Sequence, residues 1–128
     1  MNLVAIVILL AVLEFMIFGY MVGYARGKYG VKAPATSGNE IFERHFRVHY
    51  NTLEQLIVFV PSIWFFGQYV SAMWASILGV VYLLGRVLYA TSYVKDPAKR
   101  SAGFGLSSLP TTALLLGALY GAVRAALG

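Results

Sequence analysis

The chain has 128 residues, of which 59% are hydrophobic and only 12% are charged, with a net charge of +5 and no cysteine. Soluble globular domains usually carry about 25% charged residues, so this composition disfavours a soluble domain and favours a membrane protein. The absence of cysteine excludes disulfides and catalysis by a thiol of the protein itself. We interpret the positive charge as a signal of membrane topology and not of nucleic-acid binding.

Long stretches of low charge predict the membrane helices. Residues 3–24 are interrupted only by Glu14, and residues 55–85 and 101–123 contain no charge at all. A helix needs about 20 mostly apolar residues to cross a bilayer, so the middle stretch and its flanks accommodate two helices that turn at residues 67–71. The prediction is one all-α domain over the whole chain, an integral membrane four-helix bundle with helices at about 2–25, 41–67, 72–95 and 104–127.

The first predicted helix is expected to stay in the mature protein, because it has no basic segment before it and no clear cleavage site after it. Glu14 lies in its middle. A carboxylate inside a membrane segment is a functional candidate by default, and it prompts one alternative function, a small proton-coupled efflux transporter. That alternative leaves the polar groups of the next two helices unexplained.

The second predicted helix carries Arg47, Asn51 and Glu54, and either Ser37 or Asn39 is expected to cap its start. Spacings of four and three residues place the three polar side chains on one helical face. Such groups are costly in lipid, so this face is expected to line a polar cavity inside the bundle. A guanidinium, an amide and a carboxylate together suit a small zwitterionic ligand with several charges.

The third predicted helix has a polar stripe of its own, in which Tyr82, Arg86, Tyr89 and Tyr93 follow spacings of four, three and four. Tyrosines near a membrane interface often form only an aromatic belt, but an arginine in the same stripe favours a functional cavity. Glu54 is the expected partner of Arg86, since an unpaired charge is costly within a membrane. That pair is also consistent with a purely structural role.

Pro97 is expected to end the third helix, which leaves Arg100 and Ser101 at the N-terminal end of the fourth. Backbone N–H groups and the helix dipole favour an anion there. A free thiol has a pKa near 8.5, and lowering it by about two units takes about 2.7 kcal/mol. One arginine in a site of low dielectric constant can supply that stabilisation, so these two residues suit a thiolate.

Basic residues concentrate in two of the three connections between helices, and the turn at 67–71 carries none. By the positive-inside rule, both basic connections are predicted to face the cytoplasm and both termini the opposite side. The basic residues of the two connections are Arg26, Lys28, Lys32, Arg44 and Arg47 in the first, and Lys95, Lys99 and Arg100 in the second.

The string Glu43-Arg44-x-x-Arg47-x-x-x-Asn51-x-x-Glu54, followed by Gly85-Arg86-x-x-Tyr89 and by Arg100-Ser101, resembles the MAPEG family. Its members are membrane-associated proteins of eicosanoid and glutathione metabolism. The resemblance implies a homotrimer of four-helix subunits in the lipid bilayer, with glutathione bound between neighbouring subunits near the cytoplasmic side.

The resemblance also implies individual roles, with Arg100 and Ser101 stabilising the glutathione thiolate. Two departures concern the eicosanoid substrate and not the glutathione site. Arg26 is followed by Gly27 where the leukotriene C4 synthase branch has a second arginine, and Gln55 replaces a tyrosine. The implied glutathione ligands are Arg26, Arg47, Asn51, Glu54, Arg86, Tyr89 and Tyr93.

The sequence therefore predicts a membrane-bound glutathione transferase or glutathione-dependent peroxidase that acts on lipophilic electrophiles. A non-catalytic lipid-binding or scaffold member of the same family is the second alternative beside the transporter. A metal is not expected as a partner, because His45 and His49 alone make too small a ligand set. A nucleic acid is not expected either, because the positive charge is interpreted as a signal of membrane topology.

Overall fold

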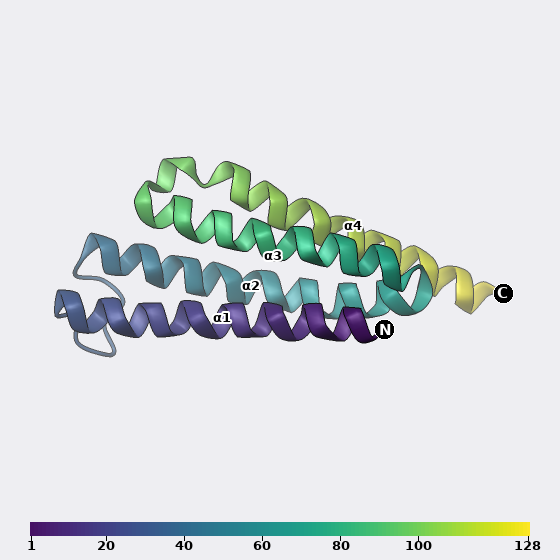
Figure 1. Cartoon of the computed structure of the whole chain (residues 1–128), viewed down its shortest axis with the longest axis horizontal. Helices are drawn as coiled ribbons and strands as arrows, with labels where there is room; N and C mark the ends of the chain where they lie inside the picture. Colours follow the sequence, from purple (N-terminus) through teal and green to yellow (C-terminus); the bar gives the residue numbers. More distant parts are fainter.

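The computed structural model describes all 128 residues as four long helices joined by short connections (Figure 1). The chain contains no strand, which confirms the all-α prediction. Each predicted helix is found close to its expected place. The elements are α1 (Asn2–Tyr29), α2 (Glu40–Tyr69), α3 (Ala72–Lys95), the short 3-10 helix η1 (Pro97–Lys99) and α4 (Ser101–Leu127).

Consecutive helices run antiparallel, so α1 and α3 are parallel to each other (Figure 1). The central helices α2 and α3 each contact all three others, whereas α1 and α4 lie on the outside of the bundle. The α1–α2 connection and the α3–α4 connection lie at the same end, with both termini and the α2–α3 turn at the other end. Both basic connections therefore share one end of the bundle, as the charge pattern requires.

The helix ends differ from the predicted ones by a few residues. α1 continues through Gly27 to Tyr29, and Gly30 ends it with a φ of 68°, a left-handed conformation that glycine adopts without strain. Asn39, and not Ser37, caps α2: its Oδ1 accepts a hydrogen bond of 2.9 Å from the Phe42 N–H. The last helix begins at Ser101, three residues before the predicted start.

Three segments are long and apolar enough to cross a membrane, namely α1, α3 and the segment Pro97–Leu127. α2 does not meet that criterion by composition, because its first half carries several charged side chains. It lies between α1 and the other two helices, and most of its charged side chains are exposed near the end of the bundle that carries the basic connections. The outer surface is apolar: Leu84 and Leu116 are 64% and 60% exposed, as expected where lipid is the solvent.

Two glycines bring α3 and α4 into backbone contact beside the predicted site. A Cβ on Gly85 would meet the backbone of Leu106 and Ser107, and one on Gly103 would meet the backbone of Tyr89. Small residues at such crossings allow close helix packing in membranes. The start of α4 is thus held directly against the polar stripe of α3.

Candidate functional site

A polar cavity of about 360 Å³ opens between α2, α3 and α4, near the end that carries the basic connections. Five of its six lining residues are predicted site residues, contributed by α2, by α3 and by the start of α4. The sixth, Phe104, was not predicted. The lining residues are Arg47, Asn51, Tyr89, Tyr93, Arg100 and Phe104.

Aromatic rings form one wall of this cavity. Tyr89 and Tyr93, one turn apart on α3, stack with their ring centroids 5.5 Å apart, and Tyr89 also meets the Phe104 ring at 6.5 Å. Tyr89 is 3% exposed, so its position is fixed by packing. The close contact at Gly103 is what allows the first turn of α4 to reach this wall.

The cavity is electropositive, because two guanidinium groups line it and no carboxylate does. Arg47 comes from α2, and Arg100 immediately precedes the first residue of α4. The Arg100 Nη1 donates a 3.0 Å hydrogen bond to the Pro97 carbonyl, which anchors the exposed side chain at the helix start. No side chain caps the N-terminus of α4, so its dipole adds to the positive potential.

Arg86 does not line the cavity but lies fully buried behind it, with 0% of its surface exposed. Its Nε donates to Ser107 Oγ at 3.1 Å, and its Nη1 donates to Asn51 Oδ1 at 2.8 Å and to Thr52 Oγ1 at 3.3 Å. The guanidinium also stacks over the Tyr89 ring, 4.3 Å from its centroid. Arg86 therefore acts on the cavity through Asn51 and Tyr89.

The expected pair of Glu54 with Arg86 is wrong. The ion pair of the chain joins Arg44 to Glu40, with 2.6 Å between Nη2 and Oε1. Glu54 is exposed and points along α2 toward α4, whereas Thr52, on the face toward α3, meets the Arg86 guanidinium. Glu54 and Thr52 lie at a similar level of α2 but on different sides of the helix.

The contact with Arg86 fixes the orientation of the Asn51 amide. Because the carbonyl oxygen accepts from Arg86, the two N–H donors of the amide remain for the cavity. Asn51 is thus a donor toward a ligand, and it suits a carbonyl or carboxylate oxygen.

A second cavity of about 330 Å³ continues the first along α2 and α4, and the two share Asn51 and Phe104. Glu54 is its only charged residue. Because Arg47, Asn51 and Glu54 line two adjoining cavities, they share one face of α2 as predicted. The Gln55 amide donates a 3.4 Å hydrogen bond to Ser108 Oγ and links the two helices. The lining residues are Asn51, Glu54, Gln55, Val58, Phe104, Ser108, Thr111 and Thr112.

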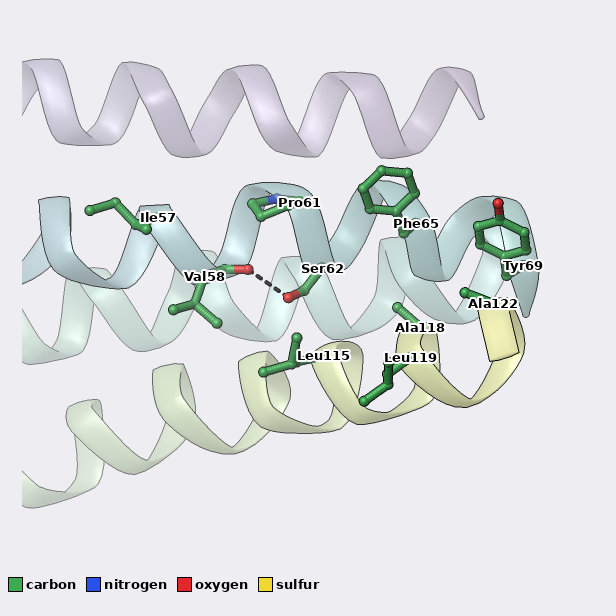
Figure 2. A pocket seen from close by; sticks show the side chains of 10 residues that line it. All are labelled: Ile57, Val58, Pro61, Ser62, Phe65, Tyr69, Leu115, Ala118, Leu119 and Ala122. Atoms are coloured by element: carbon green, nitrogen blue, oxygen red, sulfur yellow. Dashed lines mark hydrogen bonds between the residues drawn. The ribbon is translucent and has the colours of Figure 1, made fainter. Parts of the chain in front are cut away.

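A third, apolar cavity of about 550 Å³ follows, and it shares Val58 with the second (Figure 2). Figure 2 shows Val58 and Ser62 of α2 directed toward Leu115 and Ala118 of α4. The Ser62 hydroxyl donates to the Val58 carbonyl at 2.6 Å, so it offers no free donor to a ligand. The three cavities adjoin one another through these shared residues and are here together called the α2/α4 groove, whose lining changes from charged to polar to apolar.

Besides Arg86, two predicted residues do not line this groove. The Arg26 guanidinium donates to the carbonyls of Val31 and Ala35, at 3.4 and 2.8 Å, and lies 4.7 Å from the centre of the Phe42 ring. Within one chain it is therefore occupied at the α1–α2 connection. Ser101 is exposed at the start of α4 and does not line the cavity.

The sequence contained a signal for the groove residues of α4 that the prediction did not use. Ser107-Ser108 and Thr111-Thr112 repeat at a spacing of four within an otherwise apolar helix. Ser107 faces α3 and holds Arg86, whereas Ser108, Thr111 and Thr112 line the second cavity. Paired hydroxyl residues at helical spacing mark two neighbouring polar faces.

The sequence is similar to those of several known proteins. The sequence model of the MAPEG family matches residues 4–120. An uncharacterized protein of Synechocystis sp. is 50% identical over 115 residues, which cover 90% of this chain and 84% of the relative. Microsomal glutathione S-transferase 2 of Homo sapiens is 40% identical over 118 residues (91% and 80%), and leukotriene C4 synthase of Rattus norvegicus is 35% identical over 133 residues (98% and 89%).

Proposed function

The chain belongs to the MAPEG family, and on that premise we propose that it is a membrane-bound glutathione transferase for lipophilic electrophiles. The observation that carries the proposal is the α2/α4 groove, which joins an electropositive cavity to an apolar one. A tripeptide thiol and a lipid-soluble electrophile need those two environments side by side. Relatives named as glutathione transferases support the same class of reaction.

The polar groups of the groove suit the functional groups of glutathione. Arg47 would bind a carboxylate, and the Asn51 amide would donate to a carbonyl or carboxylate oxygen. Glu54, in the adjoining cavity, would accept from the ammonium group. Cavities of about 300 to 1,000 Å³ are usual for small ligands, and the first two cavities together fall in that range.

Arg100 is the proposed stabiliser of the thiolate. At neutral pH a thiol with a pKa near 8.5 is mostly protonated, so activation requires positive charge near the sulfur. Arg100 and the N-terminus of α4 supply it at the cavity wall. A transferase then needs only to hold the electrophile in the neighbouring apolar part of the groove, where proximity accelerates attack by the thiolate.

A peroxidase reaction uses the same thiolate with a lipid hydroperoxide as the electrophile.

The scaffold alternative is less well supported, because Arg47, Asn51 and Arg100 all line one cavity and provide for thiolate formation as well as binding. The proposed role of Arg26 depends on the proposed homotrimer. Because Arg26 lies apart from the cavity of its own chain, the Arg26 that contacts glutathione would come from a second copy of the chain. The glutathione site would face the cytoplasm with the basic connections.

The test is stopped-flow ultraviolet spectroscopy of the detergent-purified protein mixed with glutathione, with thiolate absorbance followed near ~240 nm. We expect a saturable signal that Arg100→Ala abolishes and that Lys99→Ala, which removes the adjacent exposed cation outside the cavity, retains. Turnover with 1-chloro-2,4-dinitrobenzene and with a lipid hydroperoxide then separates transferase from peroxidase.

Glutathione binding by calorimetry without any thiolate signal would contradict the transferase and favour a binding or scaffold protein. If neither binding nor a thiolate signal is found, the glutathione site itself is wrong. Wild-type turnover in Arg100→Ala would overturn the assignment of the thiolate stabiliser.

A further inference from the structure

A carboxylate, a phenol and a guanidinium lie in the interior of the subunit with incomplete hydrogen bonding. Three of the four buried side-chain atoms without a hydrogen-bond partner are Glu14 Oε1 on α1, and Tyr82 OH and Arg86 Nη2 on α3. A buried polar atom that is left unpaired is costly, and native structures contain few of them. Two donors and an acceptor in one region point to an interaction that they share.

The register of the helices places Glu14 beside Arg86. α1 and α3 run parallel, and the Val7 side chain packs against Gly79. Glu14 lies seven residues after Val7, and Arg86 lies seven residues after Gly79, so both are two turns further along their helices. The buried oxygen of Glu14 is therefore level with the buried guanidinium.

A second contact gives the same register. Phe18 packs in one cluster with Ala90, and Glu14 and Arg86 each precede these residues by four positions. Tyr82 lies one turn before Arg86 on α3 and is likewise fully buried. The three groups thus form one polar cluster between α1 and α3.

All other partners of Arg86 are neutral. Its hydrogen bonds go to Ser107, Asn51 and Thr52, and its face stacks on Tyr89. None of these groups compensates a full positive charge that is 0% exposed. A buried guanidinium within a membrane bundle requires a counter-charge, and the carboxylate at its level is that of Glu14, although the two groups form no ion pair within 4.0 Å in this structure.

We propose that Glu14 is the counter-charge of Arg86, and that this pair holds the guanidinium against Asn51 so that the amide presents its N–H groups to the cavity. Glu14 is thus a positioning residue for the binding site, and its place in the membrane needs no transport function. The effect on glutathione rests on the proposed function, whereas the pairing itself does not.

The experiment is a double-mutant cycle with Glu14→Gln, Arg86→Gln and the double variant in the detergent-purified protein. Glu14→Gln leaves Arg86 uncompensated, so we expect the midpoint of thermal unfolding without glutathione to fall by at least ~5 °C, and the double variant to regain most of that loss. Glu43→Gln, which removes an exposed carboxylate in the first turn of α2 but keeps an acceptor for the Gly38 N–H, is the matched control and should lower the midpoint by less than about 2 °C.

The second readout separates a positioning role from a structural one. In Glu14→Gln the KM for glutathione should rise about ten-fold, the size of one coupling energy between contacting groups, while the KM for 1-chloro-2,4-dinitrobenzene stays within about two-fold. A merely structural role would lower the active fraction and leave both KM values unchanged. An unchanged KM for glutathione would overturn the positioning role.

Unfolding midpoints that are simply additive would overturn the pair. If Glu14→Gln does not fold, the proposed pairing of Glu14 with Arg86 predicts that the double variant does fold. A double variant that also does not fold would contradict the pairing. If the wild-type protein neither binds nor turns over glutathione, the proposed function is refuted, while the unfolding cycle still decides whether Glu14 and Arg86 are coupled.

Discussion

Replacement of Asn51 by aspartate isolates the role that the structure gives to the amide. Asn51 and aspartate have nearly the same shape, and an aspartate oxygen can accept the 2.8 Å hydrogen bond from the Arg86 Nη1. The substitution therefore keeps the contact behind the cavity. It removes the two N–H donors in front and adds a negative charge to a cavity that carries two guanidinium groups.

The magnitude follows from what is lost on the cavity side. A hydrogen bond to a charged group contributes about 1.5–3 kcal/mol, so loss of the amide donors to a glutathione carboxylate should weaken binding about ten- to a hundred-fold. Repulsion between aspartate and that carboxylate adds to the loss. Stability should not fall, because Arg86 gains a second carboxylate in place of a neutral acceptor.

Isothermal titration of glutathione into detergent-purified Asn51→Asp measures this directly, with thermal unfolding as the check on folding. Thr91→Ala, which removes an exposed hydroxyl of α3 outside the groove, serves as a control and should shift the dissociation constant by less than about three-fold. Wild-type affinity in folded Asn51→Asp would refute the orientation of the amide and, with it, the indirect role of Arg86.

Two further changes test the packing of α4 and the apolar end of the groove. Gly103→Ala forces a methyl group into the Tyr89 backbone and should cost about 1–3 kcal/mol of stability by overpacking, whereas Gly105→Ala, with nothing within 4 Å, should be neutral or stabilise by up to about 1 kcal/mol in thermal unfolding. Leu119→Trp fills the apolar cavity and should raise the KM for lipophilic electrophiles several-fold with the glutathione KM unchanged. Leu116→Trp is its control, since Leu116 is equally exposed, at 60% against 59%, but lies outside the groove; equal effects of the two in steady-state kinetics would argue against the apolar substrate site.

Periodicity alone was sufficient for the features that depend on a single helix. The spacing of Arg47, Asn51 and Glu54 fixed them on one face, and the position of Pro97 placed Arg100 just before α4. Apolar length fixed the four helices, although the exact end of α1 depended on a glycine that continues the helix and another that stops it. Each of these features depends on residues that are close together in one helix, so each can be inferred from the sequence alone.

The partner of Arg86 could not be predicted in the same way, because it depends on how the helices rotate against one another. Spacing shows which side of α3 carries Arg86 but not which helix that side meets. The backbone contact of Gly85 with α4 turns Arg86 toward Ser107 and Thr52 and away from Glu54. The level of Glu14 opposite Arg86 likewise depends on the register between α1 and α3, which is given by the contacts of Val7 with Gly79 and of Phe18 with Ala90.

The arginines around the site differ in function because they differ in burial. Arg86 is completely enclosed, and Glu14, its proposed counter-charge, lies at its level, so on that proposal its charge is largely compensated before any ligand arrives. Arg47 and Arg100 are exposed, and no carboxylate lines the cavity beside them. The potential available to a thiolate therefore comes from these two side chains and the start of α4, while Arg86 determines the direction of the neighbouring amide. It follows that removing Arg100 should change the ionisation of the thiol, whereas disturbing Arg86 should change the affinity for glutathione.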